Sequence, residues 1–213
     1  LGDIAQLVLE KHHFDTPTTT HLLKQLKRYN KMARKLRSES DLPNLQTEII
    51  ADDLAGFFPS PPQDMMIRAV TFLLEKLIDL KKKGLRHIKL SYTFKGSKRG
   101  TSHFGKGRNH KTKVYPLEML IKVCAAALKW AVVQFRNHVW TQIRGAAIGS
   151  PMSPPWCIGV VMVREYLWIT SLHPPKSLRS RSWEVVRYVD NRLVLTFKTN
   201  AGIVAPRDLE TKL

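Results

Sequence analysis

The stretch RYVDNRLVL, residues 187–195, places one acidic residue between two runs of strand-forming residues. The alternating residues on both sides of Asp190 and Asn191 predict a β-hairpin with its turn at these two positions. Asp-Asn is favourable turn chemistry, so the acid has a structural explanation. The alternative is that the turn holds a carboxylate outward as a ligand for a metal ion, and the rest of the chain is needed to choose between them.

Length and composition predict a globular chain. The 213 residues suffice for one large domain or two small ones, and 43% of them are hydrophobic. No apolar run is long enough for a transmembrane helix, and the first residues lack the pattern of a secretory signal. Cys124 and Cys157 have no CxxC spacing, so a reducing, intracellular compartment is expected. Because the sequence begins with Leu1, we expect a fragment of a longer protein.

The charge predicts a polyanionic partner. Thirty-five Lys and Arg against seventeen Asp and Glu give a formal net charge of +18, which is typical of proteins that bind nucleic acid. Between Lys81 and Val114 there are twelve Lys or Arg and no acid. We interpret this segment as a Gly- and Ser-rich loop that contacts phosphates, with a solvated, disordered insertion as the alternative. A membrane surface would favour a basic amphipathic helix instead, so no membrane partner is expected.

Hydrophobic periodicity predicts an alternation of helices and strands. Helices are expected over residues 1–40, 62–83, 116–137 and 156–170. Strands are expected within residues 45–58, after His138, and in the hairpin over residues 183–197. This order predicts an α+β fold in which an antiparallel sheet packs on helices.

A second acid lies at the end of an expected strand, far from Asp190 along the chain. Asp53 closes the strand-forming run, and prolines follow it. Nucleotidyl transfer to a nucleic-acid strand uses two divalent ions about 3.5–4 Å apart, which a small number of carboxylates can hold. Adjacent antiparallel strands lie about 4.8 Å apart, so acids at neighbouring strand ends can share these ions. Asp53 and Asp190 are therefore candidates for such a pair.

Three segments resemble the palm motifs of reverse transcriptases, in the order found in that family. They are DDLAGFFPSPPQD (residues 52–64), RGAAIGSPMSP (residues 144–154) and RYVDNRLVL (residues 187–195). The family patterns are an Asp followed by an aromatic pair and Pro-Ser, then Gly-x-x-x-Gly-Ser-Pro-x-Ser-Pro, then Tyr-x-Asp-Asp. The likeness is nearest to Penelope-like, telomerase-like and non-long-terminal-repeat retroelement reverse transcriptases. It implies an RNA-directed DNA polymerase domain of a retroelement.

The resemblance implies a metal site. Asp53 and Asp190 would be the catalytic carboxylates and would bind two Mg²⁺ or Mn²⁺ ions. The main-chain carbonyl of Leu54 and the side chain of Asn191 would be further metal ligands. Asn191 stands where the family usually has a second Asp, which keeps a neutral oxygen but removes a charge.

The resemblance also implies a nucleotide site. Phe58 would lie under the sugar of the incoming deoxynucleoside triphosphate and exclude a 2′-hydroxyl. Gly149, Ser150 and Pro151 would support the template strand and the nucleotide, because glycine lets a backbone approach a base or phosphate closely. Glu165 matches a Glu that is common in the family and is interpreted as structural.

The register of the first motif has an alternative. Asp52 with Phe57 has the same five-residue spacing as Asp53 with Phe58. We prefer Asp53 because it aligns Phe-Phe-Pro-Ser with the family pattern. A purely structural alternative is that the two acids end a strand and the two Phe rings belong to the core.

The domain expectation follows from the same likeness. Residues 1–46 are expected as a helical, fingers-like segment, and residues 47–213 as the palm core with the basic insertion at about 81–114. The sixteen residues after Phe197 are too few for a thumb, so partial fingers and a palm are expected.

The implied partners are an RNA template, a DNA primer and deoxynucleoside triphosphates, and the expected location is the nucleus. The alternative function is a non-catalytic, basic RNA- or DNA-binding remnant of a reverse transcriptase. A ribosomal or other RNA-scaffold protein is a third reading of the charge, and it gives the two acids no reason to meet. The sequence leaves the oligomeric state open.

Overall fold

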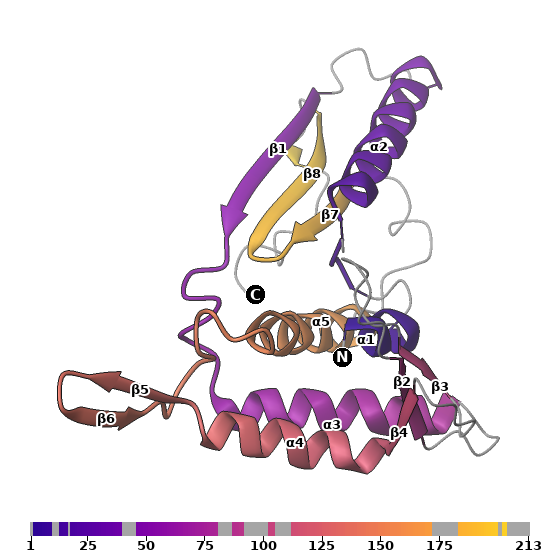
Figure 1. The fold of residues 1–213 in the computed structure, drawn as a ribbon. Coiled ribbons are helices and arrows are strands. Elements are labelled where there is room, and N and C mark those ends of the chain that lie inside the picture. The colour runs from indigo at the N-terminus through magenta and orange to yellow at the C-terminus, as the bar shows by residue number, and fades with distance from the viewer. Residues whose placement is uncertain are drawn as a thin grey trace. The chain divides into compact units, whose positions relative to one another are not determined.

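The computed structural model of the chain, drawn in Figure 1, contains five helices and nine strands within the residues that it describes. Those residues are 2–9, 13–16, 18–39, 46–80, 87–91, 102–104, 112–171, 183–199 and 202–203. The named strands pair in antiparallel fashion throughout, so the predicted α+β fold with an antiparallel sheet is confirmed. No helix in these ranges is long and apolar enough to cross a membrane.

The chain divides into two compact units, and the boundary falls inside helix α5, Ser153–Ser171. The first unit combines residues 1–10 with 58–164, and the second combines residues 11–57 with 165–213. Compactness is a different criterion from sequence likeness. The expected division into residues 1–46 and 47–213 therefore stays a prediction.

The N-terminal residues form two separate helices. Helix α1, Gly2–Leu9, belongs to the first unit, and helix α2, Thr19–Glu39, belongs to the second. Helix α2 begins where the hydroxyl oxygen of Thr18 accepts a hydrogen bond from the amide of His21, at 3.2 Å. Between the helices, Asp15 forms a strand-like bridge to Arg187. The prediction of a helix over residues 1–40 is therefore wrong for residues 13–16, because a long-range pairing competes there with local helix propensity.

Helices form the core of the first unit, where α3, Gln63–Leu80, packs against α1 and α4, Leu117–Lys129. Helix α3 starts directly after a proline, and the carbonyl of Pro62 accepts hydrogen bonds from the amides of Met65 and Met66 at 3.1 and 3.2 Å. The apolar residues that repeat with the period of this helix are buried: Met66, Ala69, Val70, Leu73, Leu74 and Leu77. The helix prediction over residues 62–83 is confirmed for the described part.

The helix expected over residues 116–137 ends at Lys129. Beyond it, β5 (Val132–Phe135) and β6 (His138–Thr141) form a hairpin, and Arg136 in its turn has a left-handed φ of 55°. The β-branched and aromatic residues of β5 favour a strand. The prediction is wrong here because the apolar spacing of these few residues fits a helix and a strand equally well.

Part of the basic insertion forms a small sheet rather than a loop. Strands β2 (His87–Ser91), β3 (Ser102–Phe104) and β4 (Thr112–Pro116) pair in the order β3-β2-β4. The expectation of a loop over residues 81–114 is wrong for these strands, because β2 alternates apolar and polar residues with the period of a strand. The other residues of the insertion lie outside the described ranges, and its contact with phosphates stays a prediction.

A four-stranded sheet with β8 at its centre forms the second unit. Strands β1 (Gln46–Asp53) and β7 (Trp183–Tyr188) flank β8 (Asn191–Thr199), and β9 (Gly202–Ile203) pairs with the far end of β8. The strand that ends at Asp53 and the existence of the β7–β8 hairpin are confirmed, whereas the turn of the hairpin differs from the prediction.

Both faces of this sheet bury side chains, because successive residues of a strand point to opposite faces. On one face Leu195 packs with Tyr29 and Ala33 of α2, which lies beside the sheet in Figure 1. The Tyr29 hydroxyl also donates a hydrogen bond to the carbonyl of Thr196, at 3.3 Å. On the other face Val194 belongs to an apolar cluster with Phe14, Val185, Ile50, Trp168 and Ile169. The sheet is therefore a firm support for the residues at its ends.

Candidate functional site

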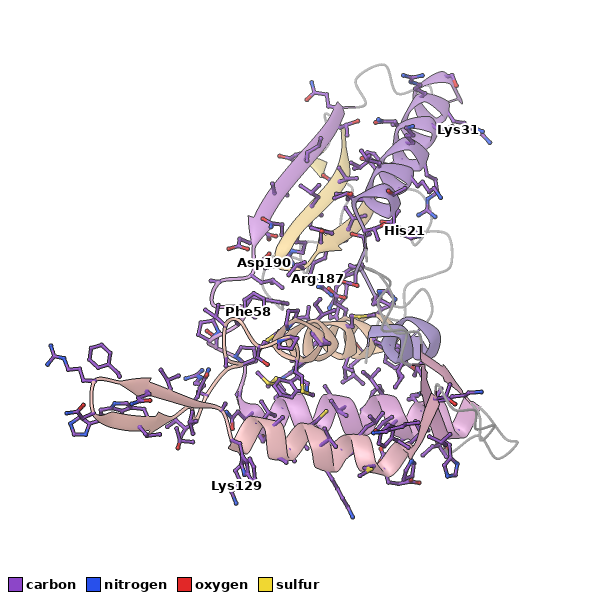
Figure 2. The ribbon with its side chains drawn as sticks, viewed as in Figure 1. His21, Lys31, Phe58, Lys129, Arg187 and Asp190 are labelled. Atoms are coloured by element: carbon purple, nitrogen blue, oxygen red, sulfur yellow. The ribbon has the colours of Figure 1, made fainter. Side chains whose placement is uncertain are left out.

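The sheet of the second unit brings Asp53 and Asp190 to one place. The last pair between β1 and β8 joins Asp53 to Asn191, and the amide of Leu54 donates a hydrogen bond to the carbonyl of Asp190 at 3.0 Å. Paired residues of antiparallel strands have Cα atoms about 4.5–5.5 Å apart. Figure 2 shows Asp190 at the closed end of the hairpin, next to the end of β1. Two acids from distant parts of the chain therefore meet at one end of the sheet.

Asp52, the alternative in the first motif, has a different role. Arg192 Nε lies 2.9 and 3.1 Å from the two carboxylate oxygens of Asp52, and its Nη2 also donates to Asp52 Oδ2. Asp52 and Arg192 are a cross-strand pair on the face of the sheet that includes Ile50 and Val194. Asp53 points to the opposite face and is exposed. The geometry therefore favours Asp53 as the acid that is available to a ligand.

The turn of the hairpin lies one residue earlier than predicted. Tyr188 pairs with Asn191, so the two turn residues are Val189 and Asp190 rather than Asp190 and Asn191. Val189 has a φ of 60°, a left-handed conformation that is unfavourable for a β-branched residue. Such a conformation costs on the order of 1–3 kcal/mol and is often found at functional sites. The turn is held in this shape by contacts beyond its own sequence.

Asn191 contacts the neighbouring acid through its side chain. Its amide nitrogen donates a hydrogen bond to Asp190 Oδ1, at 3.2 Å. A second Asp at this position would repel the Asp190 carboxylate, whereas the Asn amide stabilises it. The carbonyl oxygen of the Asn191 side chain is a possible metal ligand. Its role as a metal ligand stays a prediction.

The carbonyl oxygen of Leu54 has one hydrogen bond of its own. It accepts the amide of Phe57 at 3.1 Å, in the turn that follows β1. A carbonyl oxygen has two lone pairs, so this contact is compatible with a metal ion on the second one. The predicted role of Leu54 as a ligand is therefore compatible with the geometry and stays a prediction.

The first and second motifs meet in the first unit. The amide of Gly145 donates to the carbonyl of Pro61 at 2.9 Å, and the amide of Ala146 donates to the carbonyl of Phe58 at 2.8 Å. Gly145 has a φ of 73°, and a Cβ added there would lie 2.5 Å from the carbonyl oxygen of Pro59. Only glycine fits this close approach.

The loop before α5 has an open side at Gly149. Its φ is 96°, and no heavy atom lies within 4 Å of the position that a Cβ would take. The adjoining Ser150 and Pro151 lead into the helix, where the hydroxyl of Ser150 accepts the amide of Met152 at 3.3 Å. The open side leaves room for a ligand to approach the backbone. The predicted nucleotide contacts of Gly149, Ser150 and Pro151 stay predictions.

Phe58 is half-buried and belongs to the first unit, whereas the two acids belong to the second. Its backbone is fixed by the hydrogen bond from Ala146. Its predicted position under the sugar of a nucleotide stays a prediction.

The chemistry of the acids fits a hard divalent ion. Mg²⁺ prefers oxygen ligands and is usually held by one or two carboxylates together with substrate phosphates. Asp53 ends β1, and Asp190 lies in the β7–β8 turn whose carbonyl accepts the amide of Leu54, so two carboxylates come from adjoining segments. In the described part of the chain no group of three or more His, Cys, Asp or Glu is placed to hold a metal by itself. A metal at this pair would therefore take further ligands from the backbone, from Asn191 or from substrate.

Sequence reasoning missed the buried cation behind the turn. The side chain of Arg187 is 0% exposed and forms ion pairs with Glu165 and Asp15, at 2.7 and 3.2 Å. One signal is visible in the sequence, an Arg inside a strand otherwise rich in apolar residues. Its partners lie far away along the chain, so their identity is not predictable from spacing.

Comparison with known proteins identifies the fold. No protein-family model matches the sequence, and a search of curated proteins finds no match. The structure of apo telomerase from Candida tropicalis matches with a TM-score of 0.65 at 15% identity, over 99% of this chain and 31% of that one. Telomerase from Candida albicans, in complex with a fragment of telomeric RNA, matches with a TM-score of 0.62 at 17% identity, over 92% of this chain and 30% of that one.

The chain thus has a telomerase-like fold and spans less than a third of the length of these two telomerase chains. At such identities the likeness shows the fold and leaves the activity to be tested.

Proposed function

We propose that this chain is part of an RNA-directed DNA polymerase that transfers nucleotides to a primer 3′-hydroxyl by a two-metal mechanism. The observation that carries the proposal is that Asp53, at the end of β1, adjoins Asp190 in the β7–β8 turn. The telomerase-like fold supports it independently of those two residues. A nuclear location and a retroelement origin are proposed with it.

Each proposed site residue has a task in this reaction. Asp53 and Asp190 hold the two Mg²⁺ or Mn²⁺ ions, with Leu54 and Asn191 as further ligands. Bound ions would activate the 3′-hydroxyl and stabilise the charge on the departing pyrophosphate. Phe58 excludes a 2′-hydroxyl and so selects deoxynucleotides.

The loop before α5 provides the second part of the nucleotide site. Gly149 leaves its backbone accessible, and Ser150 and Pro151 fix the path of the loop into the helix. These residues support the template strand and the incoming nucleotide. Glycine at this place is required by the proposal because a side chain would occupy the open side.

Exposed basic side chains bind the phosphates of the RNA template and the DNA primer in this proposal. The net charge is +18, and helix α2 exposes a row of basic side chains: Lys24, Lys27, Arg28, Lys31, Arg34 and Lys35. Phosphate contacts of this kind make affinity fall steeply with salt concentration. One of the matched telomerases was solved with telomeric RNA, which supports RNA as a partner here.

Primer extension tests the proposal. The full-length protein is given an RNA template, a DNA primer and deoxynucleotides with Mg²⁺ or Mn²⁺, beside its Asp53→Asn and Asp190→Asn variants. The matched control is Asp64→Asn, which removes an exposed acid that forms an ion pair with Arg68 on the same helix, at 3.3 Å. We expect both site variants to lose about a hundredfold or more of the activity, and the control to keep it. Full activity in both site variants would refute the polymerase.

A non-catalytic nucleic-acid binder is the second candidate. The observation that favours it is the Asn191 amide, which occupies one oxygen of the carboxylate that would hold a metal. This function predicts salt-sensitive RNA binding that is the same with and without Mg²⁺, and no nucleotide incorporation. Fluorescence anisotropy with labelled RNA, in Mg²⁺ and in EDTA, separates it from the polymerase.

A further inference from the structure

Arg187 is a buried cation three residues before Asp190. Its side chain is 0% exposed, so water does not solvate the charge. Burying an unpaired charge costs several kcal/mol, and the partners of the guanidinium therefore indicate its role. Figure 2 shows the residue in the second unit, on the strand that leads into the Asp190 turn.

Two buried acids anchor the guanidinium. Its Nε and Nη2 donate to the two carboxylate oxygens of Glu165 at 2.7 and 3.2 Å, and its Nη1 donates to Asp15 Oδ1 at 3.2 Å. The side chains of Glu165 and Asp15 are 1% and 7% exposed. Glu165 also accepts the amide of Phe14 at 3.0 Å. The paired geometry with Glu165 requires an Arg, because a Lys cannot present two parallel donors.

The backbone of Arg187 is fixed as well. Its amide donates to the carbonyl of Phe14 at 2.8 Å. Its carbonyl accepts both the amide and the hydroxyl of Thr16, each at 2.7 Å. Residues near the N-terminus therefore hold the edge of β7 from the side away from β8.

The remaining contact leads to the turn. Nη1 of Arg187 also donates a hydrogen bond to the carbonyl oxygen of Val189, at 2.7 Å. Val189 is the residue with the left-handed φ of 60°. An ion pair that only stabilised the fold would need Glu165 and Asp15 and would not need this bond. The carbonyl of Val189 belongs to the peptide group that joins it to Asp190, so fixing it fixes the direction in which Asp190 leaves the turn.

We propose that Arg187 is the positioning residue for Asp190: anchored by Glu165 and Asp15, it holds the Val189 carbonyl and keeps the strained turn that presents the acid. The effect of Arg187 on catalysis rests on the proposed function, whereas the effect of Arg187 on the shape of the turn does not. The Asp190 carbonyl accepts the amide of Leu54, which adjoins Asp53. Arg187 thus keeps both acids in register through the backbone.

Amide hydrogen exchange tests this role of Arg187 without the need for an activity assay. The amide of Leu54 reports on the turn, because its acceptor is Asp190. In an Arg187→Lys variant of the full-length protein we expect this amide to exchange at least about tenfold faster. The amide of Ala146, which is bonded to Phe58 in the first unit, is the control and keeps its rate.

A second substitution, at Val189, distinguishes a positioning role of Arg187 from a purely structural one. Asn tolerates a positive φ in a tight turn better than the β-branched Val, so Val189→Asn relieves strain in the turn without the clamp. Added to Arg187→Lys, it restores the protection of the Leu54 amide to within about threefold. In primer extension, Arg187→Lys lowers kcat by about 10–100-fold with little change in the KM for deoxynucleotide, and Val189→Asn restores kcat.

Two results would overturn the proposal: an unchanged Leu54 amide in Arg187→Lys, or a loss of protection that Val189→Asn does not restore. If the wild-type protein incorporates no nucleotide, the polymerase fails, and the exchange rates still decide the role of Arg187. Should Arg187→Lys not fold, Glu165→Gln, which keeps the guanidinium and weakens its anchor, replaces it in the same comparison.

Discussion

Asp52 and Arg192 form a paired ion contact across β1 and β8, with Arg192 Nε 2.9 and 3.1 Å from the two carboxylate oxygens. The adjacent Asp53 points to the other face of the same strand. Two neighbouring acids of one motif therefore have different surroundings, and substitution tests whether they have different roles.

The first prediction concerns this pair of acids. Asp52→Asn leaves the guanidinium of Arg192, which is 10% exposed, without its carboxylate, and we expect a loss of about 1–3 kcal/mol in the free energy of unfolding. Asp53→Asn changes an exposed side chain and should alter stability by less than about 0.5 kcal/mol, while it abolishes metal-dependent incorporation. Urea unfolding and primer extension of both variants give the comparison. The reverse pattern would assign the metal to Asp52.

The second prediction concerns the loop glycines. Gly145→Ala places a methyl group 2.5 Å from the Pro59 carbonyl oxygen in addition to an unfavourable φ, so we expect a loss of about 3 kcal/mol or more. Gly149→Ala has the unfavourable φ alone and should cost about 1–2 kcal/mol. Thermal unfolding measures both. Equal losses would mean that the contact with Pro59 is not what requires glycine.

The third prediction concerns strain in the Asp190 turn. Val189→Asn relieves a left-handed, β-branched residue and should raise the free energy of unfolding by about 1 kcal/mol. The matched change Arg136→Asn, at a φ of 55° in the β5–β6 turn, should gain less because Arg is not β-branched. Denaturant titration of the two variants tests this. A loss of stability in Val189→Asn would contradict strain at the turn.

The fourth prediction concerns the thiol of Cys157 in α5. Burial raises its pKa from 9.0 to about 11, because the thiolate loses solvation. At pH 8 only about one thiol in a thousand is then ionised, so alkylation by iodoacetamide in the native protein should be at least about a hundredfold slower than in denaturant. Native alkylation at the denatured rate would contradict the burial.

The same pKa shift sets a direction for stability against pH. Between about pH 9 and 11 the folded state keeps the Cys157 proton that the unfolded state has lost, so the free energy of unfolding falls as pH rises. The contribution is complete below pH 9 and is lost as pH passes through the folded pKa. Cys157→Ala removes this term, and its stability should fall less steeply over that range.

Long elements with a clear period were predictable from the sequence. The stripe from Met66 to Leu77 repeats with the period of a helix and is buried as expected. The strand that ends at Asp53 and the β7–β8 hairpin follow from alternation and from the prolines after Phe58. The telomerase-like fold agrees with the likeness of the three motifs.

The remaining features depend on contacts that are distant along the chain. Asp-Asn has good local turn chemistry, yet the turn is at Val189–Asp190, where Arg187 holds the Val189 carbonyl. Arg187 meets Glu165 across 22 positions and Asp15 across 172, and no local pattern encodes such pairs. The end of α4 at Lys129 was not predictable, because the few apolar residues that follow fit the period of a helix as well as that of a strand.

The central claim is that Asp53 and Asp190 share one metal site, and titration of the full-length protein with Mn²⁺, followed by electron paramagnetic resonance, tests it most directly. We compare the wild type with Asp53→Asn, Asp190→Asn and the double variant. If the two acids share the site, each single variant lowers the affinity for the same bound Mn²⁺. The double variant then loses no more bound Mn²⁺ than the single variants do. Separate losses that add in the double variant, or Mn²⁺ binding unchanged in all three, would contradict it.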